Sequence, residues 1–164
     1  MLKEIKGRVW KFGDNIDTDL IYPGKCLPIL DPQEMAKHAL EGYDKEFPNK
    51  IQKGDIILAV SNFGCGSSRE QAATSLKFAG ISCVIAKSFS RIFFRNAINQ
   101  GLALVQSREA YDLIEGGEIL TVNYVSGEII TENRKIPFPP LPEIVMGILE
   151  DGGLIEHLKK SLKK

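Results

Sequence analysis

The sequence predicts an α/β fold in one domain, residues 1–164, with a mixed sheet and flanking helices. A chain of 164 residues is long enough to bury a hydrophobic core. Apolar runs typical of strands alternate with helical segments over residues 55–105, a pattern that favours parallel strand pairing. Residues 118–122 and 128–131 are two further strand-like runs on either side of Ser126-Gly127, which is typical of a hairpin.

The first elements are predicted from strand-forming residues and from turn and capping signals. Residues 3–11 are expected to form the first strand. Residues 14–30 are expected to form a loop, because two prolines and a glycine prevent regular structure. A helix over residues 31–40 follows, with Asp31 as its cap and Pro32 at its first helical position.

Five alternating segments fill the centre of the chain. They are a strand at 56–60, a helix at 72–79, a strand at 81–86, a helix at 91–100 and a strand at 102–105. Gly80 and Gly101 end the two helices, since glycine adopts the left-handed conformation of a helix C-terminus. After the hairpin, four prolines between positions 137 and 142 break the chain, and helices are expected at 143–149 and 154–163.

The composition argues against several classes of protein. The 21 basic and 21 acidic residues balance, which gives no support for nucleic-acid binding or for an RNA-binding regulatory module. No apolar run approaches a membrane span and no signal peptide is evident, so we expect a cytoplasmic protein. Cys26, Cys65 and Cys83 lie far apart, which argues against a disulfide framework and against an iron–sulfur cluster on this chain.

Residues 61–72, S-N-F-G-C-G-S-S-R-E-Q-A, connect a predicted strand to a predicted helix. Unpaired N–H groups at a helix start attract anions, and Ser67, Ser68 and Arg69 add hydroxyls and a guanidinium suited to a carboxylate or a phosphate. Glu70, three residues after Ser67, completes a capping box. In the alternative interpretation a serine merely caps the helix and Arg69 is solvated. The segment matches neither a Walker loop nor a dinucleotide fingerprint.

Three segments resemble the signatures of one known family. Residues 62–72 are similar to the G-S-S-R-E-[HQ]-A signature of the swivelling domain in the aconitase superfamily. Residues 14–24 resemble its D-x-I-[DN]-T-D-x-I-x-P segment, and residues 86–102 its A-x-S-[FY]-x-R-I-[FH]-x-x-N-x-x-x-x-G-L segment. The likeness covers nearly the whole chain, and the length resembles the stand-alone small subunits of 3-isopropylmalate dehydratase and their close relatives.

The resemblance implies a β/β/α swivelling domain that acts only with a large subunit. Such pairs are hydro-lyases, and this family interconverts 2- and 3-isopropylmalate by dehydration and rehydration in leucine biosynthesis. Matched by motif, Ser67 is the catalytic base, and Ser68 and Arg69 bind a substrate carboxylate. The four-iron–four-sulfur cluster belongs to the large subunit, so no cofactor or metal is expected on this chain. Self-association of the chain is left open.

The segment after Pro23 is expected to select the substrate. It comprises Lys25, Cys26, Leu27, Pro28, Ile29 and Leu30. Relatives that act on tricarboxylates resemble each other in having an arginine in this segment, and this chain has none there. Its apolar residues instead favour an isopropyl group, whose burial is worth about 25 cal/mol per Å² of apolar surface. Lys25 could still reach a carboxylate, and Cys26 stands where relatives often have tyrosine. Homoaconitase or another alkylmalate dehydratase is therefore the alternative.

Other polar residues have two interpretations each. Asp17 and Asp19 could hold a cation, but hydrogen bonds that shape the turn are favoured. Lys87, Arg91 and Arg95 form a basic face, for which salt bridges on a helix surface are slightly favoured over substrate binding. The two histidines have no recognisable partner and are not expected to be catalytic.

Overall fold

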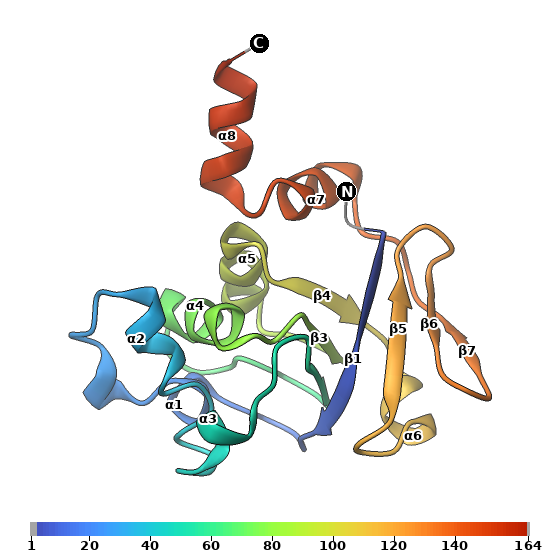
Figure 1. Ribbon diagram of the computed structural model, residues 1–164, viewed down its shortest axis with the longest axis horizontal. Helices are drawn as coiled ribbons and strands as arrows, with labels where there is room; N and C mark the ends of the chain where they lie inside the picture. The colour runs from blue at the N-terminus through green and yellow to red at the C-terminus, as the bar shows by residue number, and fades with distance from the viewer. Residues whose placement is uncertain (1–2, 164) are drawn as a thin grey trace.

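The computed structural model describes residues 3–163 and places seven strands in one mixed sheet (Figure 1). In chain order the strands are β1 (Glu4–Lys11), β2 (Ile56–Ala59), β3 (Cys83–Ala86), β4 (Ala103–Gln106), β5 (Ile119–Asn123), β6 (Glu128–Ile130) and β7 (Lys135–Pro137). Across the sheet they follow the order β4-β3-β2-β1-β5-β6-β7. The parallel pairing predicted for the centre of the chain and the predicted hairpin of β5 and β6 are both confirmed.

β1 joins the parallel half of the sheet to the antiparallel half. On one side it runs parallel to β2, with Val9 opposite Ile56, and on the other antiparallel to β5, with Gly7 opposite Leu120. A Cβ atom at position 7 would lie 2.8 Å from the carbonyl carbon of Gly54, so only glycine allows this close approach. β1 is thus the strand at which the sheet changes from parallel to antiparallel pairing.

Both faces of the parallel strands are buried, because alternate side chains point to opposite faces. Ile57 and Val84 belong to the cluster that also contains Leu76 of the helical layer. Their neighbours Ile56 and Ile85 belong to the second cluster, on the other face. This double burial explains why these strands are continuous apolar runs in the sequence.

The helices flank the sheet. They are α1 (Thr18–Ile21), α2 (Pro32–Ala36), α3 (Phe47–Lys50), α4 (Glu70–Ala79), α5 (Arg91–Gln100), α6 (Ala110–Leu113), α7 (Glu143–Glu150) and α8 (Leu154–Leu162). In Figure 1, α2, α4 and α5 lie side by side over one face of the sheet, which their mutual contacts confirm. Gly80 and Gly101 end α4 and α5 in the left-handed conformation, as predicted.

The predicted loop at 14–30 is partly helical, which corrects the sequence-based expectation. It contains α1 and a short 3₁₀ helix, Gly24–Cys26. The carboxylate of Asp17 caps α1 by accepting a hydrogen bond from the N–H of Leu20 at 2.9 Å. This cap satisfies a donor at the helix start, so a single helical turn forms although glycine and proline follow it.

Two more elements differ from the prediction. The helix expected over 31–40 ends at Ala36, because Leu40 has a φ of 60° and donates its N–H to the carbonyl of Ile21 at 2.7 Å. Pro137, expected only to break the chain, lies in β7. β7 is the edge strand of the sheet, where a missing N–H is tolerated.

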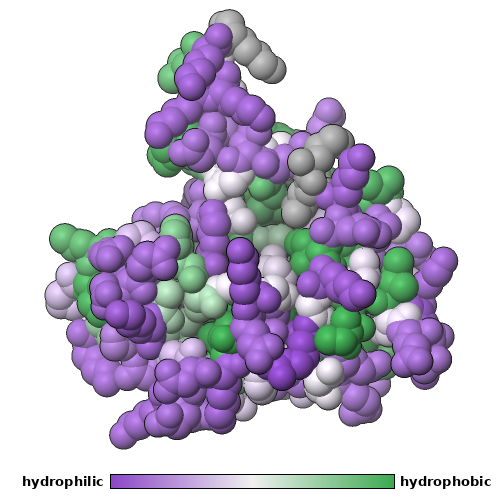
Figure 2. Space-filling model, viewed as in Figure 1, coloured by the Kyte–Doolittle hydropathy of each residue, from purple (hydrophilic) through white to green (hydrophobic). Residues whose placement is uncertain are grey.

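The surface of the visible face is largely hydrophilic (Figure 2). On α8, polar residues are mixed with the exposed apolar residues Ile155, Leu158 and Leu162. Helix α8 extends away from the sheet at one end of the molecule (Figure 1) and buries none of its residues. None of the helices within residues 3–163 is long and apolar enough to cross a membrane.

Candidate active site

The three motif segments meet beyond the carboxyl ends of the parallel strands. Residues 14–24 follow β1, residues 61–69 follow β2, and residues 87–90 follow β3. The carboxyl ends of parallel strands lie at one edge of a sheet, where open α/β folds bind their ligands. Residues 61–69 are called the signature loop below.

Backbone hydrogen bonds fix the signature loop between its two neighbours. The N–H of Thr18 donates to the carbonyl of Cys65 at 2.9 Å, and the N–H of Gly64 donates to the carbonyl of Ile16 at 2.8 Å. On the other side, the hydroxyl of Ser90 donates to the carbonyl of Gly64 at 3.0 Å. The signature loop is therefore positioned by both of the other motifs.

Gly64 lets the signature loop pass close to α5. Its φ is 81°, and a Cβ atom there would lie 2.7 Å from Phe93 Cδ2 and closer still to Phe93 Cβ and Cγ. Phe93 is 2% exposed, and its ring lies 5.2 Å from that of Phe63. Glycine at position 64 therefore sets the spacing between the loop and the helix that bears Arg91 and Arg95.

Ser67 and Ser68 are exposed in the signature loop, just before α4. The predicted capping box between Ser67 and Glu70 is wrong, because α4 begins at Glu70 and its cap residue, Arg69, makes no side-chain cap hydrogen bond. The first N–H groups of α4 thus have no side-chain partner from the cap and favour an anion nearby. Both serines are accessible to a ligand at this helix start.

Arg69 is not the solvated surface residue of the alternative interpretation. Its side chain is 14% exposed, pairs with the Asp19 carboxylate and donates to the carbonyl of Tyr22 at 3.2 Å. The hydrogen bond and the charge of Arg69 lower the pKa of Asp19, so this carboxylate is ionised at neutral pH. The guanidinium therefore links the signature loop to the turn that contains Asp19.

The two aspartates of that turn make the hydrogen bonds favoured by the sequence. Asp17 caps α1, as described above. Asp19 accepts a hydrogen bond from the N–H of Gly24 at 3.1 Å in addition to its pair with Arg69. Both carboxylates thus shape the turn beside the signature loop.

An open pocket of about 680 Å³ lies beside the signature loop. Its lining residues are Gly66, Ser90, Arg91, Ile92 and Arg95. Surface salt bridging was the favoured expectation for the basic face, and it is wrong for the two arginines. Of Lys87, Arg91 and Arg95, only Lys87 has an ion pair within residues 3–163, with Asp112 at 3.4 Å. Arg91 and Arg95 are exposed one turn apart on α5, so both guanidiniums are available to an anion.

The predicted substrate loop, Lys25 to Leu30, begins beside Arg69. A Cβ atom at Gly24 would lie 3.4 Å from Arg69 Nη2, so the loop leaves the site at van der Waals distance from the guanidinium. Leu27 is 38% and Leu30 is 87% exposed. The loop therefore presents apolar side chains to solvent.

Two residues of the substrate loop are engaged within the chain. Lys25 forms an ion pair with Glu41 at 3.3 Å. Cys26 is 3% exposed, and burial raises the pKa of its thiol, with the charge of Glu41 adding to the shift. Lys25 was the residue of this loop that could reach an additional substrate carboxylate, and in the structure it is already paired with a carboxylate of the chain.

The cysteines of the described chain do not fit an iron–sulfur cluster. Within residues 3–163, the only group of three donor side chains close enough to share a metal ion contains one cysteine; it consists of Cys26, His38 and Glu41. Cys83 is fully buried in β3, and burial raises the pKa of its thiol to about 12. Iron–sulfur clusters require several thiolates within one site.

Both histidines have carboxylate partners that the sequence analysis missed. His38 Nδ1 contacts Glu41, and His157 Nδ1 lies 2.7 Å from Asp151 Oδ2. The spacing of three residues between His38 and Glu41 was an available signal. The second pair depends on the angle between α7 and α8, which no local pattern specifies.

Comparison with known proteins gives extensive matches. A family profile described as the aconitase C-terminal domain matches residues 29–109. The 3-isopropylmalate dehydratase small subunit of Caldicellulosiruptor bescii is 54% identical over 161 residues, which cover 97% of each chain. The isopropylmalate/citramalate isomerase small subunit of Methanocaldococcus jannaschii is 51% identical over 160 residues, 96% of this chain and 95% of that one. A crystal structure described as 3-isopropylmalate dehydratase from the same organism is similar with a TM-score of 0.92 and 46% identity, covering 97% of this chain and 95% of that one.

Proposed function

We propose that this chain serves a hydro-lyase of leucine biosynthesis, because it belongs to the family of 3-isopropylmalate dehydratase small subunits. Part of the chain also matches the aconitase C-terminal domain. The reaction interconverts 2- and 3-isopropylmalate by loss of water and its return to the neighbouring carbon. The relatives above are named for isopropylmalate, and one also for citramalate. This favours an alkylmalate over homoaconitate as the substrate.

Ser67 is assigned as the base that removes the proton beside a substrate carboxylate and returns it on rehydration. A free hydroxyl is too weak an acid for this task, so its oxyanion needs stabilisation. The start of α4 at Glu70, three residues after Ser67, supplies positive potential near this hydroxyl, and Arg69 is two residues away in the chain. The exposure of Ser67 leaves it accessible to substrate.

The substrate carries two carboxylates, and the site offers basic groups on both sides of the signature loop. Ser68 and Arg69 are assigned to one carboxylate, as the family resemblance implies. Arg91 and Arg95, which line the adjacent pocket, are suited to the other. This use of the two arginines replaces the surface role expected from the sequence.

The isopropyl group is assigned to the substrate loop. The exposed Leu27 and Leu30 offer apolar surface, and Lys25 is paired with Glu41. A third carboxylate would find no arginine in this loop and would lose hydration without a bidentate partner. The loop thus supports isopropylmalate rather than homoaconitate.

The remaining parts of the catalyst are assigned to a large subunit. The small-subunit relatives imply such a partner, and the cysteines described above do not fit a cluster on this chain. We therefore assign the four-iron–four-sulfur cluster to the large subunit, with the active site shared between the two chains. A cytoplasmic location, as expected for a biosynthetic enzyme, is part of the same proposal.

One observation supports this proposal most strongly: the three motif segments converge around an exposed serine loop bordered by Arg69 and by the pocket with two further arginines. The test is reconstitution with a cluster-bearing large subunit, followed by kcat/KM for isopropylmalate, citramalate and homoaconitate. We expect each chain alone to be inactive and the mixture to prefer an alkylmalate. A clear preference for homoaconitate would contradict the substrate assignment, and no dehydratase activity with any of the three would contradict the function.

A further inference from the structure

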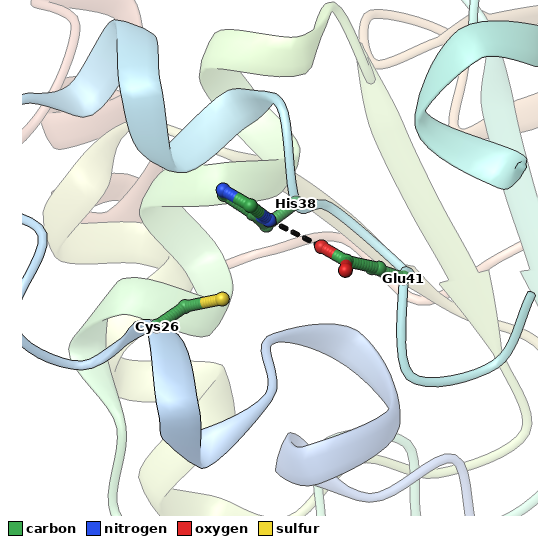
Figure 3. A group of neighbouring side chains, drawn as sticks. All are labelled: Cys26, His38 and Glu41. Carbon is green, nitrogen blue, oxygen red and sulfur yellow. Dashed lines mark hydrogen bonds and ion pairs between the residues drawn. The ribbon is translucent and has the colours of Figure 1, made fainter. Parts of the chain in front are cut away.

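A second cluster of reactive side chains lies outside the residues assigned to the reaction. Cys26, His38 and Glu41 bring a thiol, an imidazole and a carboxylate together from two segments of the chain (Figure 3). One donor atom from each lies within 4.8 Å of the other two. These three groups are the ligand types that zinc takes in proteins.

Hydrogen bonds fix the turn that carries the thiol. The hydroxyl of Tyr22 donates to the carbonyl of Cys26 at 2.7 Å, and Tyr22 itself is completely buried. The N–H of Cys26 donates to the carbonyl of Pro23 at 2.9 Å. Because its backbone is fixed at both polar groups, Cys26 presents its sulfur to the cluster without further ordering.

The other two donors are fixed by the turn that ends the α2 region. The N–H of Glu41 donates to the carbonyl of His38 at 3.1 Å, and the two side chains are in contact. Leu40, between them, is bound to Ile21 and has a left-handed backbone. This conformation turns Glu41 toward His38, so both donors face Cys26 as Figure 3 shows.

The dimensions of the cluster suit a small divalent ion. Zinc bonds of about 2.0–2.3 Å in a tetrahedron imply donor atoms roughly 3.3–3.8 Å apart. The three donor atoms lie within 4.8 Å of one another, so they must move closer together to bind zinc. Rotation of the side chains can supply this movement. The side chain of His38 is 32% exposed and that of Glu41 18%, so an ion can enter and retain a water as fourth ligand.

The cluster also has a cation at its edge. Lys25 Nζ lies 3.3 Å from Glu41 Oε1, and the Lys25 side chain is 70% exposed. A divalent ion would take the place of the thiol proton and bind the Glu41 oxygen that contacts His38, while the other oxygen, Oε1, can stay paired with Lys25. Sulfur and imidazole donors select zinc-like ions over magnesium and calcium, which prefer oxygen ligands.

We propose that Cys26, His38 and Glu41 form a binding site for a divalent transition metal ion, Zn²⁺ in the first place. The bound ion would fasten the substrate loop to the turn after α2, since Cys26 belongs to the former and the other two ligands to the latter. This proposal replaces the expectation, drawn from the sequence, that the chain holds no metal.

The test titrates the purified, metal-stripped full chain with Co²⁺, whose thiolate charge-transfer absorption reports a bond to sulfur. One equivalent is expected to bind to the wild type. Cys26→Ser should abolish the absorption, and His38→Gln should weaken binding by more than about tenfold. Added Zn²⁺ should displace Co²⁺ and raise the thermal unfolding midpoint of the wild type.

Two variants serve as matched controls. Cys65→Ser removes a partly exposed cysteine outside the cluster, and His157→Gln removes a histidine that also faces a carboxylate but has no cysteine beside it. Both should bind Co²⁺ like the wild type. If Cys26→Ser does not fold by circular dichroism, the partly exposed His38→Gln and Glu41→Gln decide the question. Absence of the absorption in folded wild type, or its loss in Cys65→Ser, would overturn the proposal.

Discussion

Replacing Gly64 by alanine tests the packing that positions the signature loop. At a φ of 81°, an alanine costs about 1–2 kcal/mol in backbone conformation. The new methyl group would also overlap the Phe93 side chain, which is buried and cannot swing into solvent. Overpacking of this kind costs about 1–3 kcal/mol, so the free energy of unfolding should fall by about 2–5 kcal/mol in total.

Gly117→Ala separates the two contributions. Gly117 has a φ of 89° and no atom within 4 Å of a Cβ built on it, so its replacement should cost only the conformational part, about 1–2 kcal/mol. In a Phe93→Ala background, Gly64→Ala should cost less than in the wild type, because the ring atoms that the methyl group meets have been removed and only the Cβ at position 93 remains. Urea denaturation of the single and double variants measures these free energies.

Two results would refute the reasoning about Gly64. One is an equal loss of stability in Gly64→Ala and Gly117→Ala, since that would leave nothing for the contact with Phe93. The other is strict additivity of Gly64→Ala and Phe93→Ala, since contacting residues are expected to couple.

Three further predictions concern the site. Arg69→Lys should lower kcat/KM of the reconstituted enzyme by about tenfold or more, because an ammonium cannot bind a carboxylate at two points; unchanged kinetics with a lower melting temperature would make Arg69 purely structural. Ile29→Arg should shift kcat/KM toward homoaconitate, since a charge-assisted pair is worth roughly 1.5–3 kcal/mol, and no shift would contradict the role of the loop. Because Arg69 lowers the pKa of Asp19, their pair stabilises the fold above the ordinary carboxyl pKa of about 3.9 and is lost as pH falls through the folded-state value. The difference in melting temperature between wild type and Asp19→Asn should therefore shrink in acid, and a pH-independent difference would speak against the pair.

The parallel half of the sheet and its two helices were predictable because their signals are local. Apolar runs bounded by glycine mark β2, β3 and β4, and Gly80 and Gly101 mark the ends of α4 and α5. The start of α4 was not predictable in the same way. Arg69 pairs with Asp19, 50 residues away, and the helix begins after that pair rather than at Ser67.

The pocket beside the signature loop and the cluster of Cys26, His38 and Glu41 both depend on tertiary contacts. Whether Arg91 and Arg95 find carboxylate partners is decided by what packs beside α5, so a helix-surface role and a binding role look alike in the sequence. Likewise, Cys26 approaches His38 only because the chain after α2 folds back through Leu40 onto Ile21. The motifs, by contrast, identified the signature loop because their residues are contiguous.

Titration of the large subunit with this chain tests the central claim most directly. With the wild-type chain, isopropylmalate dehydration should rise with added chain and saturate at a fixed stoichiometry. Ser67→Ala should bind the large subunit equally well and compete with the wild type, yet give almost no turnover, since loss of one exposed hydroxyl leaves the fold intact. Near-normal turnover with Ser67→Ala would contradict the assignment of the base, and no activity at any ratio of wild-type chain would contradict the account as a whole.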